Sequence, residues 1–313
     1  MSTKSRLGMQ LKNGVLLQHL RKARGITQEE MAAKLQMSQR RLSRIETGEL
    51  ELDMMQSIVA FEVLGFPVKD LWMIYLDVEE FEGNLQYRKI LKILSVGKVD
   101  EIRDVLPLLK ENSLAKEPLV GQFIRFASLM IDETMDANEK LKGFYSTLER
   151  TITNFEDTKI DEYRLSFNEI LIINEIALLH NQLENKDKAI ALLKGIAENV
   201  EATRTTTADK YIFFTKLLTD LYILMMEAGD YQNASKVCEQ ILNLSHDRLN
   251  PRFIPSTNYA LGVCYQKMDK NKEEYFPFLI RAYHTARAIA QHDLAGKIKK
   301  EYDGDEHSKW SFD

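Results

Sequence analysis

Hydrophobic side chains near the start of the chain recur at the spacing of an α-helix in two short runs. Met31, Ala32 and Leu35 form one apolar face, and Leu42 and Ile45 form another. Residues three or four positions apart lie on the same side of a helix, so each run predicts a short helix with one side turned inward. The polar residues between the runs predict a turn of about three residues.

Residues that cap helices stand at the ends of both runs. Thr27 and Glu30 have the spacing of a capping box, in which the threonine oxygen accepts from the amide of residue 30 and the carboxylate reaches back. Ser38 is suited to cap the second helix, and Gly48 closes it at a position that favours a left-handed backbone. With a further helix predicted over residues 15–24, the pattern indicates a helix-turn-helix motif.

Beyond residue 84 the apolar positions predict helices that recur in pairs. The expected pairs are 85–94 with 99–112, 117–134 with 137–155, 161–184 with 187–204, 208–228 with 231–246, and 256–268 with 272–292. Recurrent pairs are typical of a solenoid. The register set by Ala177, Tyr222 and Gly262 gives spacings of 45 and 40 residues, against about 34 in the usual tetratricopeptide repeat. The repeats are therefore expected to be degenerate, with lengthened helices.

The whole chain is expected to be all-α. Its 313 residues include only six prolines and fourteen glycines, so helices run with few interruptions. The stretch VKDLWMIYLDVEEFEGN, residues 68–84, changes from apolar to acidic, which is typical of a connector. We therefore expect a helix-turn-helix domain over 1–68, a connector over 69–84 and a right-handed tetratricopeptide-like solenoid over 85–313.

Charge is distributed unevenly between these parts. The chain has a net charge of −5, yet residues 1–66 hold ten Lys and Arg against seven Asp and Glu, which leaves −8 for the remainder. A basic head on an acidic body suggests a polyanion as the partner of the head. No stretch has the apolar core of a signal peptide or the length of a membrane span, so we expect a cytoplasmic protein without a membrane partner.

The motif over residues 20–68 resembles the DNA-binding domain of the lambda repressor and Cro superfamily. The residues that fall where that pattern expects them are Gln28, Ala32, Ser38, Ile45, Glu46 and Gly48. The resemblance covers about the first 68 residues and implies a five-helix domain with an internal ion pair between Arg21 and Glu46. Gln36 departs from the pattern, which usually has glycine in this turn.

In a helix-turn-helix motif the second helix enters the major groove with its first residues toward the base edges. Gln39, Arg40 and, one turn on, Arg44 would face the bases, because Gln pairs with adenine and Arg with guanine. Gln28 and Arg41 are expected to hold backbone phosphates, which fix the register. The expected DNA-binding set is Gln28, Ser38, Gln39, Arg40, Arg41 and Arg44. The alternative is that the arginines only form a solvated helix face.

A curved stack of helical pairs has an inner surface, built mainly from first helices, that commonly binds an extended peptide. Asn174 and Asn181 lie seven residues apart on one stripe of this surface, and asparagine offers both the donor and the acceptor that reading a peptide backbone requires. The expected peptide-binding set is Arg125, Asn174, Asn181, Thr219, Tyr259 and Gln266, with Arg125 neutralising a ligand carboxylate. The alternative is that these polar residues cap or bridge neighbouring helices or face water.

A repressor-type head followed by about five long tetratricopeptide-like pairs resembles the Rgg and PlcR type of peptide-responsive regulators of Gram-positive bacteria. The segment FNEILIINEIALL, residues 167–179, is similar to the asparagine-bearing helix of Rgg-like members. The resemblance implies a homodimeric transcription factor of quorum sensing. Its residues 1–68 would bind double-stranded DNA, and its residues 85–313 would bind a short signalling peptide and dimerise.

Enzymatic motifs are absent from the sequence. Its six histidines form no HExxH pair, and there is no GxxxxGK[ST], GxGxxG or GxSxG, so we expect no enzyme, no metal and no cofactor. His180 is expected to be a hydrogen-bonded structural histidine rather than a pH-sensitive ligand contact, and Cys238 and Cys264 are expected to be small buried hydrophobes. The alternatives to a peptide-gated regulator are a repressor controlled by a protein partner or by dimerisation alone, and an interaction scaffold that no longer binds DNA.

Overall fold

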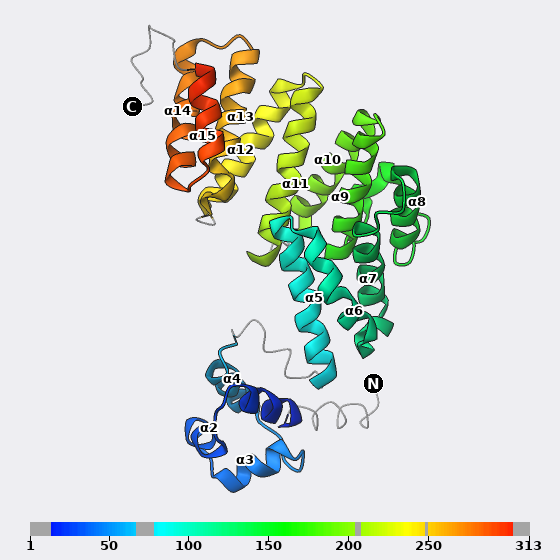
Figure 1. Cartoon of the computed structure of the whole chain (residues 1–313), viewed down its shortest axis with the longest axis vertical. Coiled ribbons are helices and arrows are strands. Elements are labelled where there is room, and N and C mark those ends of the chain that lie inside the picture. Colours follow the sequence, from blue (N-terminus) through cyan, green and yellow to red (C-terminus); the bar gives the residue numbers. More distant parts are fainter. Residues whose placement is uncertain (1–13, 67–77, 204–207, 248–249, 303–313) are drawn as a thin grey trace. The chain divides into compact units, whose positions relative to one another are not determined.

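The computed structural model describes residues 14–66, 78–203, 208–247 and 250–302 (Figure 1). Within these ranges all regular structure is helical and no strand is present, which confirms the all-α prediction. The chain divides into two compact units, Met1–Ile131 and Asp132–Asp313. Much of the expected connector, residues 69–77, lies outside the described residues.

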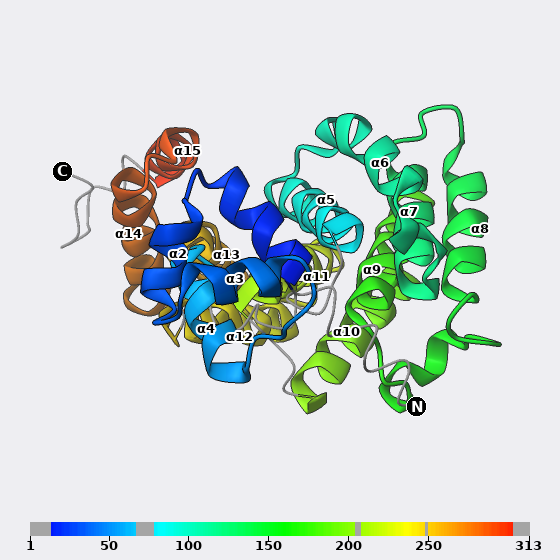
Figure 2. The same ribbon diagram turned by 90° about the horizontal axis from the view of Figure 1, so that it is seen from below.

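The first unit begins with a small bundle of helices over residues 14–66, termed the head. It contains a helix over residues 14–23, α2 (Gln28–Lys34), α3 (Gln39–Glu46) and α4 (Met54–Val63), and Figure 2 looks onto α2, α3 and α4. The side chains predicted to face inward are all at most 5% exposed: Met31, Ala32, Leu35, Leu42 and Ile45. The described part of the head thus has four of the five helices that the resemblance implies.

Both helices of the motif begin with the predicted caps. The Oγ1 of Thr27 accepts from the amide of Glu30 at 3.2 Å, and the amide of Thr27 donates to Oε2 of Glu30 at 2.8 Å. At the start of α3 the Oγ of Ser38 accepts from the amide of Arg41 at 3.2 Å. After α3, Gly48 has a φ of 79°, the left-handed conformation expected at a helix end.

The turn between α2 and α3 is built on Gln36 instead of glycine. Its φ of 52° lies in the left-handed region. The amides of Gln36 and Met37 donate to the carbonyls of Ala33 and Ala32 at 3.1 and 3.0 Å, the two bonds of a Schellman helix end. The turn therefore has the geometry that glycine would provide. Because Gln36 has a Cβ atom, this left-handed conformation is sterically less favourable than it would be for glycine.

After the head, the first unit continues with α5 (Val78–Val96), η2 (Val99–Glu101), α6 (Ile102–Glu111), η3 (Ser113–Lys116) and α7 (Pro118–Met130). The first of these helices was predicted to start at residue 85, which was wrong, since α5 begins at Val78. Phe81, in the added first turn, completes the core of the head. Its side chain is 1% exposed, and its ring meets Phe66 edge-on with centroids 5.7 Å apart. Beside it, His19 Nε2 and Glu82 Oε1 are 3.2 Å apart. Beyond these contacts α5 packs on α6.

The second unit is a series of helices that follow one another in chain order (Figure 1). Its elements are α8 (Ala137–Leu148), η4 (Asp157–Glu162), α9 (Phe167–Gln182), α10 (Lys186–Thr203), α11 (Ala208–Glu227), α12 (Tyr231–Asp247), η5 (Pro251–Phe253), α13 (Ile254–Lys267), α14 (Lys272–Ala288) and α15 (His292–Tyr302). The pairs α9 with α10, α11 with α12 and α13 with α14 each pack together. These pairs confirm three of the predicted helical pairs.

Three predicted helix boundaries in the second unit were wrong. The helix expected to reach residue 155 ends at Leu148, and η4 stands between it and α9. The start of α9 is displaced from residue 161 to Phe167 because Ser166 and Glu169 form a capping box there. The single helix expected over 272–292 ends at Ala288, and after Ala290, with a φ of 61°, the chain forms α15, which was not predicted.

The contact between α13 and α14 requires a small residue, as the predicted register implies. A Cβ atom on Gly262 would lie 2.7 Å from Cδ2 of Leu279, closer than two carbon atoms approach without displacement. Ala177 and Tyr222, the corresponding positions of α9 and α11, are 0% and 4% exposed. All three positions of the register therefore lie in the core.

Candidate functional site

The recognition helix α3 presents one apolar and one polar side. Leu42 and Ile45 are at most 1% exposed, whereas the four polar residues of the predicted DNA-binding set on this helix are exposed: Gln39, Arg40, Arg41 and Arg44. Because Ser38 caps the helix immediately before Gln39, the first turn carries Gln39 and Arg40 at its exposed surface. This arrangement places Gln39 and Arg40 at the end of α3 that a helix-turn-helix motif directs to DNA, whereas Arg44 lies in the last turn.

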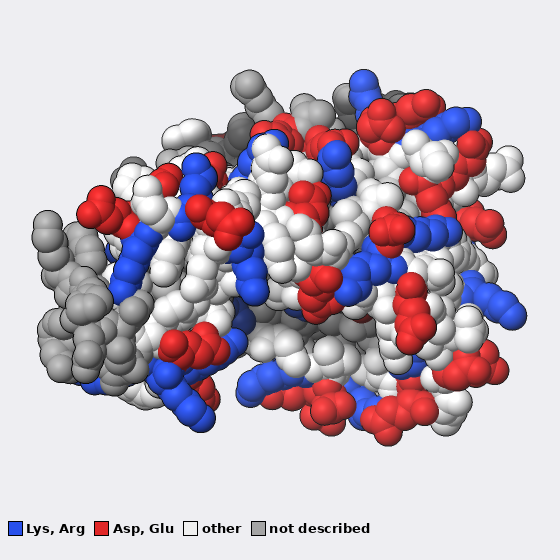
Figure 3. All heavy atoms as spheres, turned by 90° about the horizontal axis from the view of Figure 1, so that it is seen from above, with Lys and Arg blue, Asp and Glu red and all other residues white. Residues whose placement is uncertain are grey.

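Positive charge on the exposed side of α3 is not matched by acids of the same helix. The only acid of α3 is Glu46, which is 2% exposed. By contrast, the face of the molecule in Figure 3 mixes Lys and Arg with Asp and Glu. The exposed surface of α3 is therefore suited to a polyanion.

Arg44 is paired with an acid that the sequence analysis did not single out. Its Nε lies 3.1 Å from Oε2 of Glu49, and these side chains are 50% and 59% exposed. Thr47 Oγ1 donates to the other oxygen of Glu49 at 3.2 Å. An exposed ion pair of this kind contributes about 0–1 kcal/mol, so a phosphate or base edge can replace Glu49 at little cost.

Glu46 is held in the interior by the ion pair that the resemblance implied. Arg21 Nε donates to Oε1 at 2.6 Å and Arg21 Nη2 donates to Oε2 at 2.8 Å, while Arg21 Nη1 donates to the carbonyl of Ile26. Burial alone would raise the pKa of the Glu46 carboxyl, but hydrogen bonds from Arg21 and Gln28 outweigh it and lower that pKa. The pair therefore connects the helix over 14–23 to α3.

Gln28 belongs to the same buried network. Its Nε2 donates to Oε2 of Glu46 at 2.8 Å, and the side chain is half-buried at the start of α2. This bond fixes the amide beside the end of α3. Its contact with a DNA phosphate stays a prediction, in which the second amide proton of the side chain would be the donor.

Asn174 and Asn181 lie on α9, as predicted, and both are half-buried. The buried side of the same helix includes Ile173, Ile176 and Ala177, each 0% exposed. Asn174 Nδ2 donates to Oε1 of the neighbouring Glu175 over a long 3.4 Å. Its Oδ1 is buried and has no hydrogen-bond partner. The asparagine predicted to read a peptide backbone thus retains an unused acceptor.

Three other predicted peptide contacts are bonded within the second unit. Thr219 Oγ1 donates to the carbonyl of Thr215 at 2.8 Å. Tyr259 OH donates to Oε2 of Glu301 at 2.6 Å, and Tyr302 OH donates to Oε1 of Gln266 at 3.1 Å. These last two bonds join α13 to α15, which is the bridging role considered as the alternative for such residues. Their contact with a ligand stays a prediction.

Arg125 lies on α7 of the first compact unit, whereas the other five residues of the set lie in the second. Its side chain is exposed. A role in neutralising a ligand carboxylate stays a prediction for this residue.

Two half-buried acids next to the predicted stripe were missed by the sequence analysis. They are Glu175 on α9 and Asp220 on α11. Burial raises the pKa of both carboxyls, and Lys216 opposes the rise in each case. A signal for them existed in the sequence: the register that makes Thr219 equivalent to Asn174 also makes Asp220 equivalent to Glu175.

His180 has the hydrogen-bonded environment predicted for a structural histidine. It is 6% exposed, and its Nε2 lies 3.2 Å from the hydroxyl of Tyr145, which also donates to Oδ2 of Asp157 at 3.0 Å. Lys188 Nζ lies 2.6 Å from the same Asp157 oxygen. Burial, and then the charge of Lys188, lower the pKa of His180, so the ring is neutral near pH 7.

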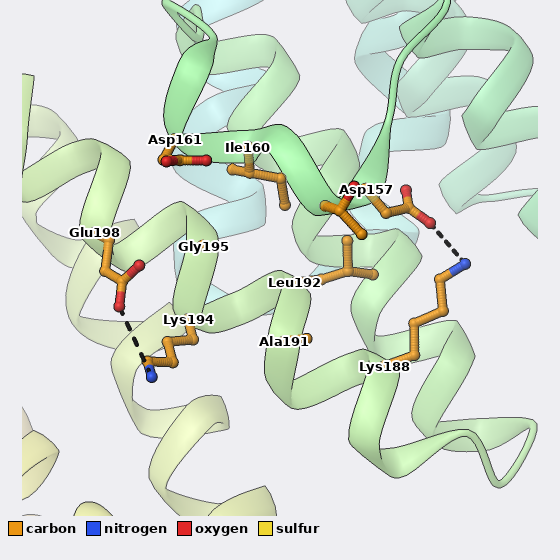
Figure 4. A pocket seen from close by; sticks show the side chains of 10 residues that line it. Asp157, Ile160, Asp161, Lys188, Ala191, Leu192, Lys194, Gly195 and Glu198 are labelled. Carbon is orange, nitrogen blue, oxygen red and sulfur yellow. Dashed lines mark ion pairs between the residues drawn. The ribbon is translucent and has the colours of Figure 1, made fainter.

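A cavity of about 600 Å³ lies beside this network, between η4 and α10 (Figure 4). Four of the five charged side chains that line it form ion pairs, Lys188 with Asp157 at 2.6 Å and Lys194 with Glu198 at 3.9 Å. None of the residues predicted to bind peptide lines this cavity. It is therefore separate from the stripe on α9.

The two cysteines are buried, as predicted, and burial raises the pKa of Cys264 to about 11. In the part of the chain that the structure describes, no helix is long and apolar enough to cross a bilayer. No group of His, Cys, Asp and Glu among the same residues has the arrangement of a metal site.

Comparison with known proteins identifies the head. Residues 14–68 match the family model described as a helix-turn-helix domain. No curated protein matches the chain.

Solved structures match nearly the whole chain. PlcR of Bacillus thuringiensis in complex with the peptide PapR7 and DNA is 17% identical, and the match covers 92% of this chain and 98% of that chain with a TM-score of 0.64. The apo form of the same protein is 16% identical over 94% of this chain and 100% of that chain, with a TM-score of 0.61. The SHP pheromone receptor Rgg2 of Streptococcus dysgalactiae is 15% identical over 94% and 99%, with a TM-score of 0.50. At these identities the likeness concerns the fold, and the architecture of the Rgg and PlcR type is confirmed.

Proposed function

We propose that this chain is a sequence-specific DNA-binding transcriptional regulator whose activity is controlled by a short signalling peptide bound to its helical repeats. The observation that carries the proposal is the combination, in one chain, of a capped and exposed recognition helix with a helical-repeat fold similar to that of PlcR, which was solved with a peptide and DNA. The proposal includes no catalytic step.

In the head, α3 would enter the major groove. Gln39, Arg40 and Arg44 are assigned to base edges, where each good bidentate pair discriminates by about 1–3 kcal/mol. Arg41 and Gln28 are assigned to backbone phosphates, which set the register without reading sequence. The Ser38 cap supports this assignment because it fixes the first turn of α3.

In the repeats, Asn174 and Asn181 are assigned to the backbone of the peptide. The unused Oδ1 of Asn174 supports this role, because an extended peptide offers amide donors at regular spacing. Thr219 is assigned to the same proposed site, and Arg125, on the first unit, is assigned to a carboxylate of the ligand. Tyr259 and Gln266 would join it when a ligand competes with their bonds to α15.

The proposed regulator is a cytoplasmic homodimer formed through residues 85–313. Two heads would then read two half-sites about one helical turn apart, or a multiple of that distance. Peptide binding would change the relative populations of dimer arrangements that fit or do not fit this spacing.

DNA binding is tested without knowledge of the operator by selecting duplexes from a random pool on the full chain. The wild type is expected to enrich one sequence, with an affinity that falls steeply as salt rises. Replacing Gln39, Arg40 and Arg44 by alanine is expected to abolish the enrichment. Alanine at Lys194, Lys236 and Lys267, exposed lysines of the repeats, serves as the control and should leave it intact. Absence of any enriched sequence in the wild type would contradict the proposal.

A further inference from the structure

Two neighbouring first helices, α9 and α11, carry polar residues at equivalent repeat positions. Glu175 and Asp220 are separated by 45 residues, the spacing between Ala177 and Tyr222 that sets the register. We use the name α9–α11 seam for Asn174, Glu175, Lys216 and Asp220. The charges of Lys216 and Asp220 on α11 both act on Glu175 of α9, and α10 packs against both helices.

Some hydrogen-bond acceptors in the seam are left without a donor. Asn174 Oδ1 and Asp220 Oδ2 are both buried and have no partner. Glu175 receives one long bond, 3.4 Å from Asn174 Nδ2. Buried polar atoms are nearly always paired in folded proteins, and leaving one unpaired costs free energy. All three residues therefore offer oxygen atoms to a donor that the chain itself does not supply.

The electrostatics of the seam also favour the binding of a positively charged group. Burial raises the pKa of Glu175, Lys216 and Lys140 oppose the rise, and Asp220 adds to it. Burial also raises the pKa of Asp220, again against Lys216. Among the described residues, neither Lys216 nor Lys140 forms an ion pair with Glu175 or Asp220. The negative charge of these two carboxylates is therefore only partly compensated. An additional cation would stabilise both ionised forms.

We propose that the α9–α11 seam binds the cationic group of the peptide ligand, an ammonium or a guanidinium, between Glu175 and Asp220. This inference rests on the proposed function and deepens it by giving the chemical class of the ligand. An ammonium carries three N–H donors, and the seam offers acceptors on three residues. The amide oxygen of Asn174 is an observation independent of the acids, since a neutral acceptor also requires a donor.

A side chain next to the seam favours an organic cation over a metal ion. Ile223, one turn after Asp220 on α11, is 40% exposed, the highest value for an isoleucine among the residues that the structure describes. An apolar group of a peptide would cover it and remove that surface from water. A bare metal ion would leave it exposed.

The test uses two pools of short synthetic peptides randomised at every position, one with a free and one with an acetylated α-amino group. Each pool is incubated with the full chain, and the retained peptides are identified by mass spectrometry. The wild type is expected to enrich cationic peptides. If only the free-amine pool is retained, the group is the α-ammonium; if Lys or Arg is enriched in both pools, it is a side chain. Either pattern supports the proposal.

The variant is the double substitution Glu175→Gln and Asp220→Asn, which keeps the shape of the seam and removes its charge. It is expected to retain peptides while the preference for cations falls about tenfold or more, because charge-assisted hydrogen bonds are lost. The control is Glu198→Gln on α10, whose side chain is 59% exposed and pairs with Lys194 at 3.9 Å. It should keep the preference of the wild type. Circular dichroism of each variant confirms that it is folded.

Three results would overturn the inference. Retention of peptides by the wild type without a cationic preference would reject the seam as a cation site and leave the proposed function standing. An unchanged preference in the double variant would have the same meaning. Failure of the wild type to retain any peptide from either pool would reject the proposed function and this inference together.

Discussion

The carboxylates of Glu46 and Asp220 are both removed from water to a large extent, but they differ in the hydrogen bonds that they receive. Glu46 receives hydrogen bonds from Arg21 and Gln28, so its pKa is lowered in spite of its burial. Asp220 has an unpartnered oxygen, and burial raises its pKa. The first carboxylate therefore stabilises the head when charged. The second weakens the repeats when charged, until a cation binds.

Glu46→Ala is expected to destabilise the head by about 3–5 kcal/mol, because it leaves the buried guanidinium of Arg21 without its partner. Hydrogen exchange of α2 and α3, followed by mass spectrometry, measures the loss. Since the folded-state pKa of Glu46 is lowered from 4.5, its contribution is present above that value and disappears as the pH falls through the folded-state pKa. The control Glu49→Ala removes an exposed acid and should cost less than about 0.5 kcal/mol. Equal effects of the two variants would contradict this account.

Asp220→Asn is expected to stabilise the ligand-free chain near pH 7 by roughly 1 kcal/mol, because it removes an incompletely paired buried charge. A raised pKa means that the charged form costs stability above the folded-state pKa, and that the cost is absent below the ordinary value of 3.8. The difference in thermal unfolding between variant and wild type should therefore shrink as the pH falls. A variant that is less stable than the wild type at pH 7 would show that Asp220 has a structural partner.

At the scale of helices, the sequence predicts best what depends on neighbours along the chain. The start of α3 follows from Ser38, and the end of α3 follows from Gly48, since both act within a few residues. The capping box at Ser166 was overlooked, which displaced the predicted start of α9. The core faces of α2 and α3 were also predicted, because helical periodicity is local.

Contacts between residues distant in sequence could not be predicted in the same way. The bond from Tyr259 to Glu301 depends on α15, 42 residues further along the chain. Nothing in the local pattern of Tyr259 distinguishes an inward-facing ligand contact from a bridge between helices. Phe81 presents the same difficulty, because its place in the core of the head follows from tertiary packing rather than from the period of α5.

The turn between α2 and α3 provides a test of backbone conformation. Gln36→Gly is expected to stabilise the head by about 1 kcal/mol, because Gln36 has a φ of 52° and glycine adopts this region without a steric penalty. Lys34→Gly, a change of an exposed residue within α2, should destabilise the head by about 1 kcal/mol. Hydrogen exchange of α2 reports both changes. Destabilisation by Gln36→Gly would mean that the glutamine side chain makes a contact that outweighs its backbone strain.

At the scale of the molecule, α5 connects the head to the first helices that follow it. Its first turns contribute Phe81 to the core of the head, and its remainder packs on α6. A change in the position of α6 would therefore act on the head through a continuous helix. In the proposed regulator, this continuous helix would carry a displacement of α6 to the DNA-binding head.

Phe81→Ala is expected to remove this connection at a cost of about 3–5 kcal/mol to the stability of the head. The matched control is Leu85→Ala on the same helix, because Leu85 is 38% exposed and Phe81 is 1% exposed. The control should change the stability by less than about 0.5 kcal/mol. Faster hydrogen exchange in the helix over 14–23 with Phe81→Ala, and not with Leu85→Ala, is the expected result. Equal exchange in both variants would mean that Phe81 is not required by the head.

The central claim is that one chain couples peptide binding in the repeats to DNA binding in the head. The most direct measurement is the affinity of the full chain for its selected duplex, by fluorescence anisotropy, with and without a saturating amount of a peptide retained from the synthetic pools. The account predicts a change of roughly 5-fold to 150-fold, the range of typical coupling free energies, and its loss when Asn174 and Asn181 are replaced by alanine. Identical affinities of the wild type with and without the bound peptide would contradict it.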